Sequence, residues 1–324
     1  LAILLVAVSA TASATQVDAY WFGVDPDWTL STNWTSGRVP MYQDGDPEIS
    51  YVLWRNPKLY MDIVILPEQT MTCGQIRLGD NRDIDHATYG KPEYTVTVQG
   101  TIIDRQISGG NGVLTMSARE GTVQRLIIDG GLFRTEGAPT IGASLAATPP
   151  ASGVCAIIVK NGGELITQHF NLPAATVDVG GHSRIIVRNG SWYMEGGRLE
   201  QINPGVNGTK VILDVGDGWV SIPGDWVSDY TQREIDGKLT AHQGRAHLIF
   251  NFDGIRTIIT SDGSYTKACV PSPANGIDGV AVDADLAWSG PLSEPNDMQV
   301  TGEYPDQPDY KYDVYFAKAG EELQ

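Results

Sequence analysis

Short apolar runs that end at Gly, Asn or Asp repeat along most of the chain. Examples are YTVTVQG (94–100), RLIIDGG (125–131) and TVDVGG (176–181). Runs of this length between turn residues are typical of β-strands, and no long stretch places apolar residues at helical spacing. The pattern predicts an all-β chain in which residues 94–262 form short strands and under about a tenth of the chain is helical.

Five segments share one plan, in which an apolar run is followed by Asn or Asp, then Gly, then a second run. They span residues 125–137, 156–170, 184–197, 211–224 and 248–261. Their turn pairs are Asp129-Gly130, Asn161-Gly162, Asn189-Gly190, Asp217-Gly218 and Asp253-Gly254, spaced 32, 28, 28 and 36 residues apart. Such pairs tolerate positive φ and suit tight corners. We interpret the longer intervals as loops at 143–153 and 228–246 that interrupt a repeat.

Two architectures produce this plan. An Asn-Gly turn can close a hairpin, which leads to an antiparallel sandwich. Each unit can instead be one coil of a β-solenoid, with the apolar triplets stacked in parallel sheets. Consecutive apolar residues suit a strand that is buried on both faces, so the pattern favours the solenoid.

Composition and charge argue against some classes of function. The chain has 324 residues and a formal net charge of −17, and no basic cluster suggests a nucleic-acid partner. Cys73, Cys155 and Cys269 form no CxxC pair, which argues against a zinc ribbon. One disulfide with one thiol and three buried thiols both remain open.

Candidate chemistry is sparse. The carboxylates of the repeats do not recur at a shared register outside the turn positions, and no HExxH or GxSxG motif occurs. We therefore do not expect an enzyme, and no cofactor is predicted. Asp80, Asp83 and Asp85 lie close together and form a weak Ca²⁺ candidate, although solvated turn carboxylates explain them more simply.

The chain begins with LAILLVAVSATASA, an apolar run followed by the A-x-A pattern Ala12-Ser13-Ala14. This pattern is typical of a secretory signal, and the run is too short to span a bilayer. Three N-x-S/T sequons, at Asn33, Asn189 and Asn207, are candidate sites for a covalent glycan. We expect an extracellular or cell-surface location.

Residues 20–49 resemble the segment that begins many bacterial extracellular β-solenoid proteins. The matching positions are Trp28, Asn33-Trp34, Gly37, Pro40 and Asp44. The resemblance implies a cap that closes the first coil, with its tryptophans in the core. Together with the repeats that follow, the resemblance implies that residues 20–262 form a β-solenoid domain.

Residues 263–324 resemble the start of fibronectin type III-like modules in surface proteins of planctomycete-like bacteria. The matching positions are Pro271, Pro273, Gly276, Val280, Leu286, Trp288, Asp313, Val314, Tyr315 and Phe316. Asp313 and Ala317 depart from the pattern, which has His and Gly there. A complete module of this class needs about seven strands, and the tail has room for about three. The resemblance implies an incomplete sandwich.

An incomplete sandwich leaves a strand edge unpaired, and residues 1–19 form an apolar arm that can fill it. The sequence therefore predicts the subunit of an extracellular homopolymer, in which one copy donates its arm to the C-terminal sandwich of the next. The donated side chains are Ile3, Leu4, Leu5, Val6 and Val8, and the accepting ones are Trp288, Val314 and Phe316. The alternative is a secreted β-helix that binds or acts on carbohydrate, with a signal peptide cleaved after Ala14.

Overall fold

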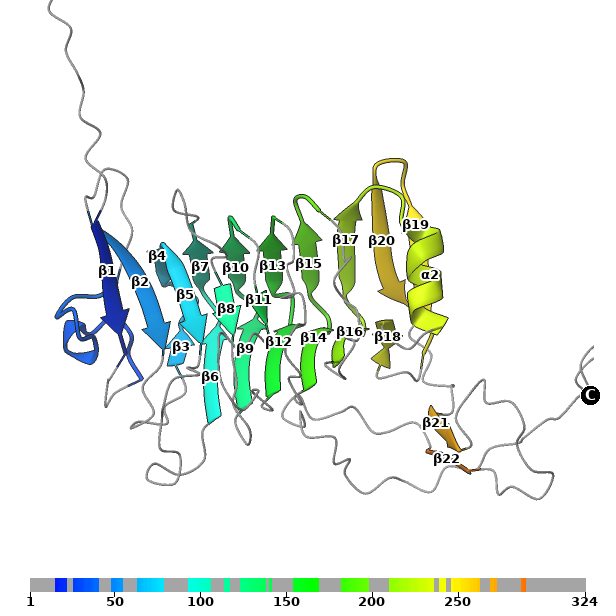
Figure 1. The fold of residues 1–324 in the computed structure, drawn as a ribbon, viewed down its shortest axis with the longest axis horizontal. Helices are drawn as coiled ribbons and strands as arrows, with labels where there is room; N and C mark the ends of the chain where they lie inside the picture. The colour runs from blue at the N-terminus through cyan, green and yellow to red at the C-terminus, as the bar shows by residue number, and fades with distance from the viewer. Residues whose placement is uncertain are drawn as a thin grey trace, which may run out of the picture.

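The computed structural model of the chain describes residues 15–21, 26–40, 48–54, 63–78, 93–105, 114–116, 123–137, 140–141, 154–168, 182–197, 210–235, 239–242, 246–262, 269–272 and 287–289. Most of these residues lie in strands, as predicted (Figure 1). One short α-helix and one 3-10 helix complete the described elements.

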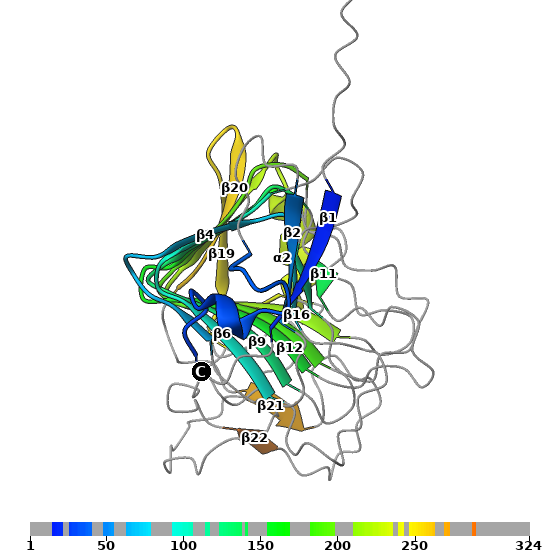
Figure 2. The ribbon, with the colours of Figure 1, turned by 90° about the vertical axis from the view of Figure 1, so that its left-hand side faces the viewer.

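Three sheets enclose the interior, as the view along the stack shows (Figure 2). The five-stranded sheet contains, in order, β1 (Thr15–Tyr20), β2 (Glu48–Trp54), β5 (Gln75–Leu78), β8 (Leu114–Met116) and β11 (Thr140–Ile141). The seven-stranded sheet contains β3 (Ile63–Ile65), β6 (Glu93–Val98), β9 (Val123–Asp129), β12 (Val154–Lys160), β14 (His182–Val187), β16 (Lys210–Val215) and β18 (Leu239–Ala241). The eight-stranded sheet contains β4 (Thr70–Cys73), β7 (Thr101–Asp104), β10 (Leu132–Thr135), β13 (Glu164–Thr167), β15 (Ser191–Met194), β17 (Trp219–Pro223), β20 (Arg256–Ser261) and β19 (Leu248–Phe252).

Parallel pairing excludes the hairpin alternative for four of the five turn pairs. The strands on either side of the Asn161-Gly162 turn, β12 and β13, lie in different sheets, and each pairs in parallel with its counterparts in neighbouring repeats. The Asp253-Gly254 turn differs, because it joins β19 and β20 as an antiparallel hairpin. The fifth apparent repeat is therefore a hairpin at the C-terminal end of the stack.

The corners between the seven- and eight-stranded sheets use glycine for two different reasons. Asn161 and Gly162 have positive φ values of 52° and 78°, as the turn chemistry predicts. Gly131 instead lies so close to the preceding repeat that a Cβ atom would be 2.4 Å from the Gly100 carbonyl oxygen. The same close approach to the previous repeat recurs at Gly100, Gly163, Gly190 and Gly218. Gly190 and Gly218 are absent from the positive-φ residues, so the close approach, and not positive φ, accounts for glycine at these two positions.

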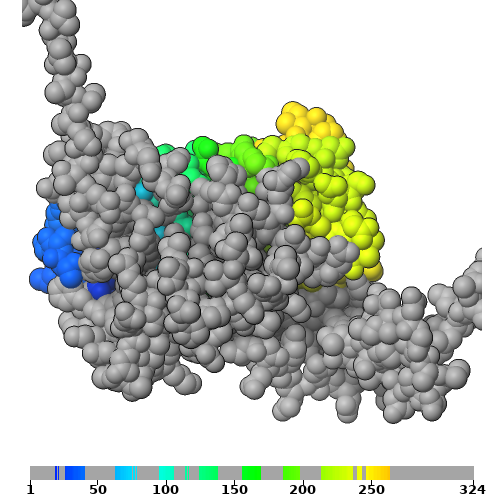
Figure 3. Space-filling model, in the orientation of Figure 1, coloured from blue at the N-terminus to red at the C-terminus, as the bar shows by residue number. Residues whose placement is uncertain are grey.

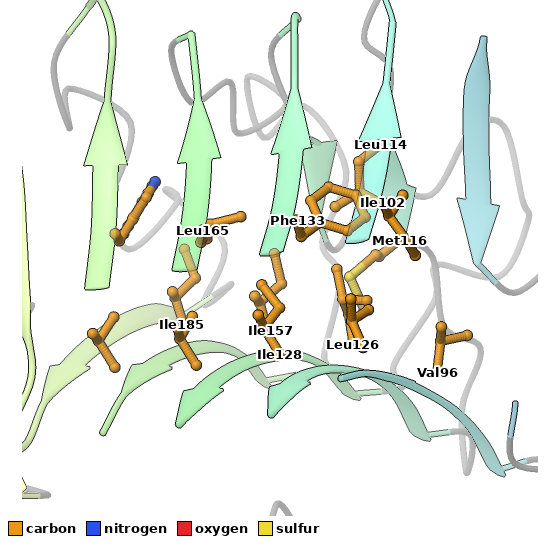
Figure 4. Close-up of a cluster of buried hydrophobic side chains, with 14 of the residues drawn as sticks. Val96, Ile102, Leu114, Met116, Leu126, Ile128, Phe133, Ile157, Leu165 and Ile185 are labelled. Atoms are coloured by element: carbon orange, nitrogen blue, oxygen red, sulfur yellow. The ribbon is translucent and has the colours of Figure 1, made fainter. Parts of the chain in front are cut away.

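The apolar triplets of the repeats are buried, but on two faces of the seven-stranded sheet. Leu126, Ile157, Ile185 and Leu213 share one register row, and Ile128, Val159, Val187 and Val215 share another. Both rows belong to the main core, where side chains from opposite sheets meet (Figure 4). Ile127, Ile158 and Ile186 lie between these rows and form part of a second buried cluster with Ala156. Because successive side chains point to opposite faces, only a strand covered on both faces uses three apolar residues in succession.

The N-terminal end of the stack is packed by tryptophans. Trp28 and Trp34 are buried, which confirms the prediction that they are core residues. Trp21 and Trp34 form an edge-to-face pair with ring centroids 5.0 Å apart, and the Trp28 indole N–H donates to the Gln69 side chain at 2.7 Å. The 3-10 helix η1 (Ser31–Asn33) lies within this segment.

The C-terminal end carries α2 (Val227–Ile235), which we had interpreted as part of a loop. Asp225 accepts a hydrogen bond from the Val227 N–H before the first turn, and Arg233 lies in the last turn, where a cation is favourable. Tyr230 is the buried residue of the helix and packs near Phe250 of β19. A nine-residue helix that buries one side chain carries too little periodicity to detect in the sequence.

The described elements near the two predicted domain boundaries are β1 and a small C-terminal sheet. The boundary between residues 19 and 20 falls inside β1, which pairs with β2 over its whole length. In the tail, β21 (Cys269–Ser272) and β22 (Ala287–Ser289) pair antiparallel in a separate two-stranded sheet. The rest of the tail lies outside the described residues, so a fibronectin type III-like module stays a prediction.

Candidate functional site

The outer face of the eight-stranded sheet carries two straight rows of side chains. Along each strand, inward residues such as Phe133, Leu165 and Trp192 are fully buried, so the alternate residues point outward. Strand register aligns these outward residues across the sheet. The first row is Thr70, Thr101, Leu132, Glu164, Ser191 and Trp219, and the second is Thr72, Ile103, Arg134, Ile166, Tyr193 and Ser221.

Two aromatic side chains on this face are exposed to solvent. Trp219 is 40% exposed and Tyr193 is 37% exposed, whereas Trp21, Trp28, Trp34 and Trp192 are buried. The two residues lie on the adjacent strands β17 and β15. Exposed aromatic rings that share one flat face are unusual enough to suggest a binding surface.

Arg256 of β20 is held in a fixed position beside these rings. Its guanidinium carbon lies 4.0 Å from the centre of the Tyr193 ring, within range of a cation–π interaction. The same side chain donates to the Ser221 hydroxyl at 2.6 Å, to the Ser221 carbonyl at 3.0 Å and to the Met194 carbonyl. These contacts bind the charged group to the sheet and orient the tyrosine.

Asp253 forms the acidic edge of the same area, in the turn of the β19–β20 hairpin, which projects from the C-terminal end of the stack (Figure 3). One of its carboxylate oxygens accepts hydrogen bonds from the N–H groups of Arg256 at 2.7 Å and Ile255 at 2.8 Å. These donors hold the pKa of Asp253 below its ordinary value. An ionised carboxylate is therefore available as a hydrogen-bond acceptor at the edge of the depression.

Tyr193, Trp219, Asp253 and Arg256 line a shallow, open depression together with Ser221, Ile258 and Thr260. The depression combines exposed aromatic surface with hydroxyl groups, one carboxylate and one oriented guanidinium. This arrangement can stack against the apolar face of a ligand and form hydrogen bonds at its edges. Sugar rings present this combination of C–H faces and hydroxyl edges.

A second polar feature lies inside the stack. Cys73, Asp104, Thr135, Thr167 and Met194 occupy one register row of the eight-stranded sheet and are all buried. Both carboxyl oxygens of Asp104 lack a hydrogen-bond partner in the described structure. Burial, with a smaller contribution from Glu136, raises the pKa of Asp104 well above its ordinary value. Burial and the neighbouring Asp104 likewise raise the pKa of the Cys73 thiol.

The structure places only some of the predicted site residues. Asn33 is buried, and its side-chain amide donates to the Asp27 carbonyl at 2.8 Å, so the side chain would have to leave this buried position to carry a glycan. Asn189 is exposed in a corner turn, where a glycan would have space. Cys73 and Cys155 are buried thiols.

The remaining predicted residues cannot be placed. Asn207, the Ca²⁺ candidates Asp80, Asp83 and Asp85, the arm residues 3–8, and Val314 and Phe316 lie outside the described residues. Trp288 lies in β22, but the position of its side chain is not described. Within the described ranges, no three His, Cys, Asp or Glu side chains gather as a metal site.

The sequence reading missed Trp219, although a signal for it exists. The residue directly after each close-approach glycine faces outward, as Leu132, Glu164 and Ser191 do. Trp219 directly follows Gly218, whereas Trp192 comes two residues after Gly190 and faces the core. The position relative to the glycine therefore separates the exposed tryptophan from the buried one.

Comparison with known proteins identified no matching family model, curated protein or solved structure. Among the helices that the structure describes, none is long and apolar enough to cross a membrane. The outer face of the eight-stranded sheet is the candidate functional surface.

Proposed function

We propose that the protein is an extracellular β-solenoid that binds polysaccharide through the outer face of its eight-stranded sheet. In this proposal each repeat is one coil, and the coils stack to build a flat, rigid surface. Three features support the solenoid: parallel pairing between repeats, corner glycines in close contact with the previous repeat, and apolar rows that run through the interior.

The exposed pair Trp219 and Tyr193 carries the binding part of the proposal. Leaving large aromatic surface in water is unfavourable, and the other tryptophans whose side chains are described are buried or partly buried. A sugar ring that stacks on Trp219 would remove this surface from water. Hydroxyl groups at its edge would then be within reach of the hydroxyl side chains of Ser191 and Thr260 on the same face.

A secreted location agrees with this function. The A-x-A pattern at Ala12–Ala14 is typical of a signal-peptide cleavage site. Polysaccharides of cell walls and matrices are then accessible to the exposed face. Assembly into a homopolymer through residues 1–14 is a separate hypothesis that rests on the sequence alone.

Glycan binding to a Trp219→Ala variant tests the proposal. Screening the wild-type protein on an array of plant, algal and bacterial polysaccharides should identify a ligand, and affinity electrophoresis should measure its affinity. We expect Trp219→Ala to bind at least about tenfold more weakly, because truncating a central aromatic side chain typically has an effect of this size.

Leu30→Ala is the matched control, because Leu30 is also 40% exposed but lies in the N-terminal segment. It should bind as the wild type does, and circular dichroism should show that both variants are folded. Equal binding by the wild type and Trp219→Ala would refute the proposal, as would the failure of every polysaccharide to bind.

A further inference from the structure

A second hollow on the same face lies beside the glycine corner. It is lined by Pro67, Gly100, Thr101, Gly131, Leu132 and Glu164, among others. Glycines form part of its lining, and at Gly100 and Gly131 the neighbouring backbone leaves no room for a side chain. The hollow therefore lies where neighbouring repeats stack closely.

Strand register joins this hollow to Trp219. Thr101, Leu132 and Glu164 line the hollow, and all three belong to the outward row that continues through Ser191 to Trp219. Neighbouring strands are ~4.8 Å apart, so the four steps from β7 to β17 span ~19 Å. The row thus forms a straight track that crosses the strands.

The side chains of the track indicate the class of ligand. Thr101 and Ser191 supply hydroxyls, Leu132 supplies apolar surface, and Glu164 supplies an exposed carboxylate. Asp253 lies off this row, in the turn of the β19–β20 hairpin, and the chain as a whole carries a formal net charge of −17. A carboxylate in the middle of the track and an acidic chain repel a polyanion, whereas the carboxylate accepts hydrogen bonds from sugar hydroxyls.

We infer that a linear, neutral polysaccharide binds along this track, with one sugar stacked on Trp219 and its chain extending across the strands to the hollow at the glycine corner. This inference rests on the proposed function and adds the ligand's charge, its shape and its direction on the sheet. Several consecutive sugars contact the protein, so affinity depends on the length of the ligand.

Chain length is therefore the test, with linear gluco-, xylo- and manno-oligosaccharides as probes in isothermal titration calorimetry. For the series that binds, we expect the hexasaccharide to bind the wild type more tightly than the disaccharide. Glu164→Ala should weaken the hexasaccharide about tenfold, the size of one lost hydrogen bond to a charged group, and leave the disaccharide unchanged. Gln168→Ala is the control, because Gln168 is exposed just beyond the other end of the same strand, β13.

Each result separates the inference from the proposed function. If Trp219→Ala weakens binding but the hexasaccharide and disaccharide bind equally, or Glu164→Ala has no effect on the hexasaccharide, the track is wrong and the aromatic site stands. Tighter binding of polygalacturonate than of any neutral chain overturns the assignment of a neutral ligand. If no glycan binds and Trp219→Ala abolishes self-association in sedimentation velocity, the face binds a second copy, and both proposals fail.

Discussion

Replacing Gly131 and Gly162 with alanine separates the two reasons for glycine at the corners. Gly162 has a φ of 78°, but its missing Cβ would meet no atom within 4 Å. A Cβ on Gly131 would instead lie 2.4 Å from the Gly100 oxygen, 2.6 Å from the Val98 oxygen and 2.7 Å from the Gln99 carbonyl carbon. All three are backbone atoms of the preceding repeat, so no side-chain rotation can relieve the overlap.

The two variants should therefore lose different amounts of unfolding free energy. An L-residue in the left-handed region costs ~1–2 kcal/mol, and alanine recovers ~0.4–1 kcal/mol by restricting the unfolded chain, so Gly162→Ala should lose about 1 kcal/mol. In Gly131→Ala, the new methyl group must push the strand that follows Gly131 away from the backbone of residues 98–100. The Leu132 N–H to Gly100 carbonyl and Glu164 N–H to Gly131 carbonyl hydrogen bonds, both 2.8 Å, are then stretched. Two weakened hydrogen bonds and the steric strain together should cost about 3–5 kcal/mol.

Urea unfolding followed by tryptophan fluorescence measures both changes. With equal m-values, the midpoint of Gly131→Ala should fall well below that of Gly162→Ala. If Gly162→Ala is the more destabilised variant, or the two are equal, then positive φ and not the close approach of repeats dictates glycine at these corners. Our account of the stacking would then be wrong.

Three further predictions concern the core and the arm. Burial raises the pKa of Asp104, so the folded chain keeps a proton that the unfolded chain releases above about pH 3.9. The free energy of unfolding therefore falls as the pH rises from this value toward the pKa of Asp104 in the folded chain. Asp104→Asn should remove this pH dependence of the free energy of unfolding. Parallel pH profiles of unfolding for the wild type and the variant would contradict the prediction. Ile186 is only 5% exposed, so Ile186→Asp should bury an unpaired charge and lower the free energy of unfolding, measured in urea, by about 3–5 kcal/mol. The control Ile186→Val should lower it by only ~1 kcal/mol. Similar losses for the two variants would show that water reaches this site. Deleting residues 1–14 should leave the circular dichroism spectrum unchanged and abolish any fibres seen by electron microscopy, and fibres of unchanged symmetry would exclude the donor-strand hypothesis.

The sequence by itself determined the strands and the repeat. Apolar triplets such as Ile157–Val159 and turn pairs such as Asn161-Gly162 act over a few residues, through side-chain alternation and backbone φ, and both can be read without the fold. The burial of Trp28 and Trp34 was also predictable, because a resemblance in the N-terminal segment placed them in the core.

Only the tertiary structure decided how the repeats pair and which side chains reach the surface. Asn189-Gly190 and Asp253-Gly254 have similar turn chemistry, yet the first is a corner between two sheets and the second closes a hairpin. Trp192 and Trp219 stand one residue apart relative to their turn glycines, but only the structure shows that the residue directly after the glycine faces outward, so that Trp219 is exposed and Trp192 is buried. The physical reason is register: a shift of one residue reverses the face of a side chain, and register is set by contacts between repeats about thirty residues apart.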